Sequence, residues 1–456
     1  MRILLISPSK EMFPPAYPLG ISYLSEYLHK NGHETSILDL LKEDDEKLAL
    51  KNEIESFNPD LIGFSIRNID NTIESIPKLY YANFKELIDF VKSITSTEII
   101  LGGAGFSILP DEMLKFYDVK YGIVGEGEMP FLQFVDKMEA GEQIDNIDGL
   151  IINHEGVIRK IPHRHNQFFM SENFPLRDSK IIDHYRPDGR IWMNIQAKRG
   201  CNQKCIYCVY PVLEGDRFQL RDPRSVGDEI EYLNRELGAE ILSFVDGIIN
   251  MPLDYAEAIC HEIIKRDLKL EWNAAFIPEK NSITPEYIRL VRKSGCNVID
   301  FSGTDCASEK MLANMKKPYS KQDIINVSKI CKDEGARIVH SLLFGAPGET
   351  LDTIRESLDL MEEINPDNVW LSLGIRIYPN TDIEKAAQAE GVIRENEPML
   401  SPKFYISPEI KNENWYELIQ SYSSRNPHWS FACLARNFSE WVTEIIKYAE
   451  AVQEFA

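Results

Sequence analysis

Three cysteines stand close together near the middle of the chain, where Cys201, Cys205 and Cys208 give a C-x3-C-x2-C spacing directly after the apolar residues 191–195. Thiolates are soft ligands that suit iron–sulfur clusters, and a [4Fe–4S] cluster normally takes four of them. With three, one iron would lack a protein ligand and could bind a second molecule. We therefore expect a [4Fe–4S] cluster with one open iron.

A zinc site is the alternative for these thiols. Zinc sites usually bring a fourth cysteine or histidine at a recognisable spacing. The nearest downstream cysteine is Cys260, which stands alone, and no histidine lies close in the sequence. The spacing favours the cluster and leaves zinc as the weaker interpretation.

The composition limits the partners and the compartment. The chain has 456 residues and a net charge of −22, so it lacks the cationic field that nucleic acids require. It also lacks an apolar stretch of the ~18 residues that span a bilayer, and residues 1–8 are typical of a strand rather than of a signal peptide. Five of the eight cysteines are scattered singly, unlike a disulfide framework. We expect a cytoplasmic monomer that binds neither nucleic acid nor membrane.

Strands and helices alternate through residues 1–150. Apolar strand-like runs occupy residues 2–7, 35–39, 61–65, 98–101 and 121–124, and residues 19–31 have helical spacing. This order predicts a doubly wound parallel sheet, in which ligands bind beyond the carboxyl ends of the strands. Gly102, Gly103, Gly125 and Gly127 fall at those ends, where they would let the backbone approach a bulky ligand.

Residues 151–190 are expected to form a linker of short strands and polar turns. Its His163 and His165 form a potential metal pair, but a His-x-His in a loop without a third ligand is more often solvated.

The alternation resumes at residue 191. Six strands are expected at 192–197, 240–245, 270–275, 298–301, 336–343 and 369–373, with a helix at 226–237 capped by Ser225. They predict a partial (β/α)6 barrel over 191–394, whose ligands should gather at the C-terminal ends of the strands. Residues 395–456 are aromatic-rich, with helical spacing at 414–422 and 439–451, and are expected to cap the barrel and shape a substrate pocket.

The cysteine loop, with the aromatic Tyr207 before its last cysteine, resembles the signature of radical S-adenosylmethionine (SAM) enzymes. In that family the open iron chelates SAM through its amino and carboxylate groups. Four further segments follow barrel strands in the family's order. The residues that the resemblance places around SAM are Tyr207, Asp246, Gly247, Asp305, Gly345, Pro347, Gly348 and Tyr378.

The resemblance implies a role for each of these segments. Asp246-Gly247 would hold the SAM amino group, Asp305 rather than Asp300 would bind the ribose hydroxyls, and residues 345–349 would pack under SAM. The segment with Tyr378 would meet the adenine. The alternative for each segment is a turn with a helix cap, as expected for Thr350 and Thr381.

Residues 1–150 resemble the cobalamin-binding domain of B12-dependent radical SAM enzymes. The matching segments are 14–20, 63–68, 101–106 and 124–128, and the cobalamin-binding residues that they imply are Tyr17, Pro18, Leu19, Ser65, Arg67, Asn68, Gly102, Gly103, Ala104, Gly125, Glu126 and Gly127. The Asp-x-His-x-x-Gly motif, whose histidine ligates cobalt in many B12 proteins, does not occur. We expect cobalamin without a protein histidine on cobalt.

Arg67 matches a position that is distinctive of one branch of the family. In the branch that includes the thiostrepton-pathway tryptophan 2-C-methyltransferase, an arginine in this loop approaches the lower face of cobalt. There it would disfavour a sixth ligand and favour the electron-rich Co(I) state. The alternative for Arg67 is a surface ion pair with Asp70 or a neighbour.

The resemblance implies a cobalamin-dependent radical SAM C-methyltransferase, with Cys201, Cys205, Cys208 and Arg67 as its catalytic residues. Methyl would pass from SAM via methylcobalamin to a carbon of a small-molecule or natural-product substrate, by radical or by polar chemistry, with flavodoxin or ferredoxin as electron donor. The alternatives are a rearrangement or ring closure without methyl transfer, and a non-catalytic B12 or SAM sensor. A methylthiotransferase is disfavoured because the chain lacks an N-terminal cysteine trio and a basic C-terminal module.

Overall fold

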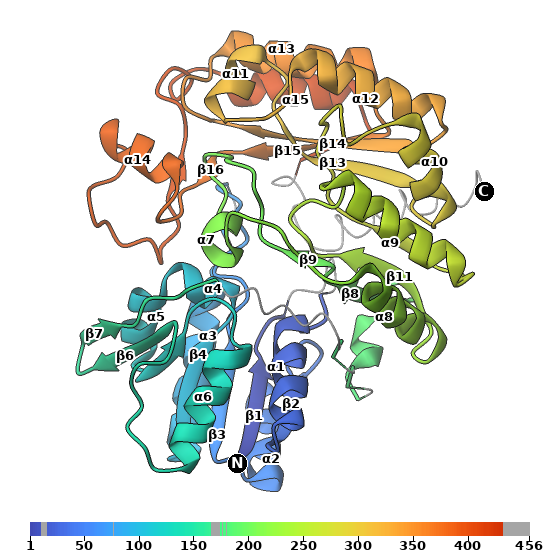
Figure 1. Ribbon diagram of the computed structural model, residues 1–456. Helices are drawn as coiled ribbons and strands as arrows, with labels where there is room; N and C mark the ends of the chain where they lie inside the picture. Colours follow the sequence, from blue (N-terminus) through green and yellow to red (C-terminus); the bar gives the residue numbers. More distant parts are fainter. Residues whose placement is uncertain (11–15, 76, 166–173, 176, 179, 432–456) are drawn as a thin grey trace.

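The computed structural model describes residues 1–10, 16–75, 77–165, 174–175, 177–178 and 180–431. The chain forms two parts, each built on parallel strands (Figure 1). The parallel strands of the first part point toward α7 (Tyr210–Glu214) and β9 (Lys198–Arg199) of the second part. No helix within the described ranges has the length and apolar character needed to cross a membrane.

The first part is a seven-stranded sheet in the order β2-β1-β3-β4-β5-β6-β7. Its strands are β1 (Arg2–Ser7), β2 (Glu34–Asp39), β3 (Leu61–Ser65), β4 (Glu98–Gly102), β5 (Tyr121–Ile123), β6 (Leu150–His154) and β7 (Val157–Lys160). Its helices are α1 (Leu19–Lys30), α2 (Glu46–Phe57), α3 (Tyr80–Ile94), α4 (Ala104–Ile108), α5 (Pro110–Tyr117) and α6 (Glu128–Glu139). The first five strands are parallel, and the order reverses between β1 and β3, where ligands of such sheets bind.

The sheet continues beyond residue 150. β6 pairs antiparallel with β5, and β7 pairs antiparallel with β6. The first residues of the predicted linker therefore belong to this sheet, while the domain limits themselves stay a prediction.

The second part holds the six strands expected from the sequence. They are β8 (Ile191–Ile195), β11 (Ala239–Phe244), β12 (Glu271–Asn273), β13 (Val298–Asp305), β14 (Arg337–Phe344) and β15 (Asn368–Leu373). β8, β11 and β12 are parallel neighbours, as are β13, β14 and β15, and a parallel bridge between Ala275 and Asp300 joins the two groups. A strand that was not expected, β18 (Trp429–Phe431), extends the second group beside β15.

Helices connect the barrel strands. They are α7 (Tyr210–Glu214), α8 (Pro223–Arg235), α9 (Leu253–Lys265), α10 (Pro285–Lys293), α11 (Glu309–Asn314), α12 (Lys321–Asp333), α13 (Leu351–Ile364), α14 (Asp382–Ala389) and α15 (Trp415–Arg425), with a 3-10 turn η1 (Ile182–Tyr185). Short strand pairs are formed by β9 (Lys198–Arg199) with β10 (Gln219–Leu220) and by β16 (Ile375–Arg376) with β17 (Phe404–Tyr405). The predicted fold class, a doubly wound sheet plus a partial (β/α)6 barrel, is confirmed.

Two details of the helices are now clear. The N-cap of α8 is Asp222 and not Ser225, because Pro223 suits the first helical position and the Asp222 carboxylate accepts from the Arg224 amide at 2.7 Å. Thr350 caps α13 and Thr381 caps α14, as predicted. The helix expected at 439–451 lies outside the described residues.

A buried carboxylate, Glu229 of α8, joins the two parts. Its oxygens accept from Arg177 Nη2 at 2.6 Å and from Arg221 Nη1 at 2.5 Å, and all three side chains are fully buried. Arg177 also donates to the Asn194 carbonyl oxygen, at 2.9 Å. Arg221 donates to the Tyr23 hydroxyl of α1, at 3.2 Å, so the cluster reaches from the end of β8 to the first sheet's covering helix.

Further buried contacts hold the same two parts together. Arg376 Nε donates to Asp70 Oδ2 at 3.0 Å, and both side chains are almost fully buried. The Tyr17 amide donates to Asn194 Oδ1 at 2.9 Å. The Glu112 carboxylate accepts from the Met399 amide at 2.9 Å. The orientation of barrel and sheet is therefore fixed by hydrogen bonds at several separate points.

Replacing Glu229 by alanine should destabilise the protein strongly. The change leaves the Arg177 and Arg221 guanidinium groups buried without a counter-charge, which typically costs about 3–5 kcal/mol. Urea unfolding followed by circular dichroism, under anaerobic conditions, measures the loss.

The matched control is Glu231→Ala, on the same helix. Glu231 also pairs with two arginines, Arg235 at 2.9 Å and Arg266 at 3.3 Å, but at the partly exposed face of α8. This variant should lose about 1 kcal/mol or less. Equal losses in the two variants would contradict the structural role assigned to Glu229.

Candidate active site

The three-cysteine loop follows β8 and is clamped by the segment after α7. The Cys201 amide donates to the Gly215 carbonyl oxygen at 3.1 Å, and the Gly200 amide donates to Glu214 Oε2 at 3.1 Å. Gly200 has a φ of +79°, and a Cβ there would lie 2.1 Å from the Arg217 carbonyl oxygen. Only glycine fits this approach, so the loop's geometry is set before any ligand binds.

The three thiols are free and mutually close enough to influence one another's ionisation. Burial raises the pKa of Cys201 and Cys205, and raises that of Cys208 to about 12. Buried thiols of this kind ionise readily only when a metal compensates the charge. Three such thiols in one clamped loop fit the predicted iron–sulfur cluster.

A buried lysine that the sequence did not reveal adjoins this loop. Lys317 Nζ lies 3.4 Å from Cys205 Sγ, 3.3 Å from the Tyr207 hydroxyl and in an ion pair with Asp305. The Tyr207 hydroxyl donates to Asp305 Oδ2 at 2.5 Å. Two predicted SAM contacts, Tyr207 and Asp305, are therefore in one hydrogen-bonded group. Lys317 follows Lys316 after a short helix, a pattern typical of a solvated surface, so sequence spacing carried no signal for it.

Asp246 holds the start of the cysteine loop. Its carboxylate accepts from the Lys198 amide at 2.5 Å and from the Ala197 amide at 3.2 Å, and the side chain is buried. Gly247, next in the chain, lies against the Tyr210 ring, with a would-be Cβ 3.4 Å from it. Contact of these residues with SAM stays a prediction, but the carboxylate already has a positioning role.

The Gly345–Glu349 segment after β14 forms a second clamped turn. Glu349 Oε2 accepts from the Gly345 amide at 2.5 Å and from the Ala346 amide at 3.2 Å. Burial raises the pKa of Glu349 to about 7, and its Oε1 has no hydrogen-bond partner among the described residues. Gly345 and Gly348 have φ values of +110° and +78°. The buried Glu349 carboxylate thus fixes the backbone of this positive-φ turn, which the resemblance places under SAM.

The neighbouring predicted SAM contacts lie on the same side of the barrel. The Pro347 carbonyl oxygen accepts from Asn314 Nδ2 at 2.8 Å. Tyr378 follows β16, where its carbonyl oxygen accepts from Thr381 Oγ1 at 2.6 Å and its ring lies 4.8 Å from the Arg376 guanidinium.

The predicted cobalamin residues follow parallel strands and so lie at one edge of the first sheet. Gly102, at the end of β4, has no atom within 3.9 Å of a would-be Cβ, whereas one at Gly103 would lie 2.6 Å from the Ile66 carbonyl oxygen. This close packing of the β3 and β4 loops, beside an open glycine, fits a flat ligand above the strand ends. Tyr17 lies at the same edge, buried, and its hydroxyl accepts from the Asp178 amide at 2.9 Å.

Arg67 follows β3 and is half-buried. Its carbonyl oxygen would lie 2.9 Å from a Cβ at Gly105, so the loop is held tightly against α4. Asp70, considered above as its partner, accepts from Arg376 through Oδ2 and from the Thr72 amide through Oδ1 at 2.8 Å. The Asp70 carboxylate thus already has partners for both of its oxygens.

The cluster loop and the cobalamin edge meet directly. Arg199, two residues before Cys201, donates through Nη2 to Glu128 Oε1 at 2.6 Å, and both side chains are buried. Glu128 opens α6, immediately after the Gly125–Gly127 turn. The two predicted cofactor sites are therefore joined by a buried, hydrogen-bonded ion pair.

Comparison with known proteins agrees with this arrangement. Residues 195–361 match the radical SAM superfamily, and residues 12–135 match the B12 binding domain. The tryptophan 2-C-methyltransferase of Streptomyces laurentii is 25% identical over 86% of this chain and 75% of its own length. The radical SAM methyltransferase TsrM from Kitasatospora setae, solved with cobalamin and a [4Fe–4S] cluster, superposes with a TM-score of 0.84 at 23% identity, over 94% of this chain and 92% of TsrM.

A second relative has the same organisation at greater distance. The cobalamin-dependent SAM radical enzyme OxsB with aqua-cobalamin bound has a TM-score of 0.76 at 17% identity, over 93% of this chain and 67% of OxsB. Fold and site thus define a protein in which a B12-binding sheet faces a cysteine-loop barrel. The two matched regions together exceed half of the chain, which belongs to the radical SAM enzymes that carry a B12-binding domain. The predicted family and the predicted cofactor set, a [4Fe–4S] cluster, SAM and cobalamin, are confirmed.

The buried carboxyl group of Asp300, which was not chosen as the ribose-binding residue, should make the stability of the protein depend on pH. Asp300 lies in β13, burial raises the pKa of its carboxyl from 3.8 to about 7, and its Oδ1 has no hydrogen-bond partner in the described chain. A raised carboxyl pKa means that stability is lost as pH rises from about 4 to about 7. Asp300→Asn should therefore stabilise the protein at pH 8, by at most about 4 kcal/mol.

Urea unfolding at several pH values checks this expectation. The difference between variant and wild type should shrink steadily as the pH falls toward 4. Asp44→Asn, at an exposed position, should be neutral throughout. A destabilised Asp300→Asn at pH 8 would show that the carboxylate is charged and has a counter-ion.

Proposed function

We propose that this protein is a cobalamin-dependent methyltransferase that moves the methyl group of SAM to a carbon of a small molecule. The observation that carries the proposal is the buried Arg199–Glu128 ion pair, which joins the cysteine loop to the cobalamin edge of the sheet. A protein that used the two cofactors separately would not need to fix their loops to each other. The relatives named as methyltransferases, including TsrM with tryptophan and a SAM analogue bound, support the same activity.

Each cofactor is held by its own group of residues. Cys201, Cys205 and Cys208 hold the cluster, and the Tyr207–Asp305–Lys317 group with the turn at Gly345 holds SAM. The glycine-rich ends of β4 and β5 support the corrin. When bound, these groups supply an electrophilic methyl group, a cobalt centre that can accept it and a source of single electrons. The chain's own contribution is orientation and the exclusion of water.

Arg67 is proposed to lie beneath cobalt. Its place after β3, in a loop pressed against α4, supports this position. A fixed cation there disfavours a positively charged metal centre and a lower ligand. The same position favours polar methyl transfer, although the radical route stays open.

Methyl transfer to the corrinoid can be tested without knowing the final acceptor. Anaerobically reconstituted protein with cobalamin, titanium(III) citrate and SAM deuterated in its methyl group should yield label in the extracted corrinoid and an equal amount of S-adenosylhomocysteine. A rearrangement enzyme or a sensor would give neither. Mass spectrometry of both products decides between them, and tryptophan is the first acceptor to add because a relative uses it.

The control is the triple variant with Cys201, Cys205 and Cys208 changed to alanine. It should lose iron and sulfide while it retains cobalamin, because the cobalamin residues lie on the other part of the chain. Stoichiometric 5′-deoxyadenosine with a labelled acceptor would identify the radical route, and its absence the polar one. Retention of iron by the triple variant would contradict the assignment of the cluster ligands.

A further inference from the structure

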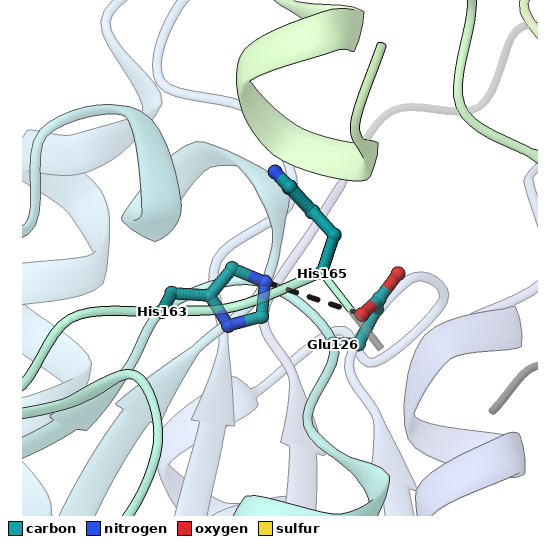
Figure 2. Close-up of side chains that lie close together, drawn as sticks. All are labelled: Glu126, His163 and His165. Atoms are coloured by element: carbon teal, nitrogen blue, oxygen red, sulfur yellow. Dashed lines mark ion pairs between the residues drawn. The ribbon is translucent and has the colours of Figure 1, made fainter. Parts of the chain in front are cut away.

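Three side chains capable of binding a metal meet beside the cobalamin edge. Glu126 follows β5, and His163 and His165 follow β7 (Figure 2). One ligand atom from each lies within 4.8 Å of the others. The sequence showed the His-x-His pair but no third ligand, because Glu126 is 37 positions away from His163 in the chain.

The His163 ring lies in a socket made by two glycines. A Cβ at Gly125 would lie 2.3 Å from Nε2, and one at Gly149 would lie 3.2 Å from Nδ1. Both glycines have positive φ values, +80° and +69°. The ring therefore occupies space that the backbone keeps free for it, and it is not a solvated loop residue as expected from the sequence.

Both nitrogens of this ring are buried and lack a hydrogen-bond partner among the described residues. Only 10% of the side chain is exposed, so the missing partners are not replaced by bulk water. A neutral imidazole with an unused nitrogen is the form in which histidine binds metals.

Two carboxylates face the two nitrogens of His163. Nε2 is 4.0 Å from Glu126 Oε2 (Figure 2). On the other side of the ring, Nδ1 is 3.7 Å from Asp148 Oδ2. In zinc sites the histidine nitrogen that does not bind the metal commonly donates its hydrogen to a carboxylate, which fixes the tautomer of the ring. Asp148 thus lies on the Nδ1 side of the His163 ring, where it can fix the tautomer. Glu126 lies on the Nε2 side, where the metal would bind.

The other comparable group in the described residues is already satisfied. His33 lies near Asp136 and Glu139, but its Nε2 contacts Asp136 at 3.0 Å and its Nδ1 lies 3.3 Å from the Met1 amino group. That amino group also pairs with Glu139, at 3.0 Å. This second group therefore already holds a cation beside it, the Met1 ammonium.

We propose that Glu126, His163 and His165 bind a divalent transition metal ion of the zinc class. Two imidazoles and one carboxylate form a familiar zinc ligand set that leaves a fourth position for water. Ligand atoms on a tetrahedral zinc lie roughly 3.3 Å apart, so the present group must contract by about 1 Å. His165 is exposed and can supply this movement by rotating its side chain, while His163 stays in its socket.

The metal site would connect three parts of the structure. Glu126 belongs to the cobalamin edge, and the histidines belong to the segment between the two parts. The His165 ring also packs on Gly215, with a would-be Cβ 3.3 Å from it, and the Gly215 carbonyl oxygen clamps Cys201. A metal here would fix the connecting segment against both cofactor regions.

Metal analysis of the loaded protein tests the proposal. Protein reconstituted with cluster and cobalamin is incubated with two equivalents of zinc chloride and desalted, and its zinc, iron and cobalt are measured by mass spectrometry. Wild type should retain about one zinc per chain, and His163→Ala and Glu126→Gln should lose it roughly tenfold or more. Iron and cobalt should be unchanged in His163→Ala, whereas Glu126→Gln is compared with wild type for zinc alone because Glu126 is also a predicted cobalamin contact. His154→Ala, an exposed histidine at the end of β6, is the matched control and should retain zinc.

The possible outcomes separate the alternatives. The triple cysteine variant should also retain one zinc, and loss of zinc there would overturn the proposal by placing the ion on the thiols. Equal zinc in wild type, His163→Ala and Glu126→Gln would overturn it too. So would loss of cobalt without loss of zinc in His163→Ala, which would make the imidazole a corrinoid contact. Zinc-edge anomalous scattering at His163 would support it directly.

Discussion

The structure depends on one buried carboxylate between two buried arginines. Glu229 compensates Arg177 and Arg221, whose remaining donors reach the main chain at the end of β8 and the hydroxyl of Tyr23 on α1. Such a group adds little net stability over an apolar core, but it is expensive to break and tolerates only one arrangement. It therefore fixes where β8 ends relative to the first sheet, and the three-cysteine loop begins at that point.

Much of the fold could be predicted because its information is local. Strands such as β1 and β4 are buried along almost their whole length, so the runs 2–7 and 98–101 are continuous apolar segments, and glycines follow the second of them. The cysteine spacing is equally local. Contacts between distant residues left no such pattern. Lys317 and the Arg199–Glu128 pair depend on the packing of segments about 70 or more positions apart, and no periodicity encodes them.

The corrected expectations have the same cause. His163 was expected to be solvated because its sequence neighbours offer no third ligand, yet the fold brings Glu126 to it from another strand end. Ser225 was expected to cap α8 because serine suits that position, but Asp222 with Pro223 suits it three residues earlier. Both expectations followed from the neighbouring sequence, and in each case another residue, Glu126 or Asp222, changed the environment that the structure shows.

Two buried lysines lie beside the cysteine loop, although the chain as a whole is strongly acidic. The protein carries a net charge of −22, yet the buried Lys198 lowers the pKa of Cys201 and the buried Lys317 lowers that of Cys205, each partly opposing the effect of burial. The Lys198 ammonium donates to the carbonyl oxygens of Ile249 and Met251 near the Asp246 carboxylate, and Lys317 forms an ion pair with Asp305 at the end of β13. Because thiolates and a cluster add negative charge in a dry site, buried cations beside them reduce the cost of that charge. The net negative charge of the chain and the two buried cations beside the thiols are thus compatible, because oxygen acceptors hold each lysine in place.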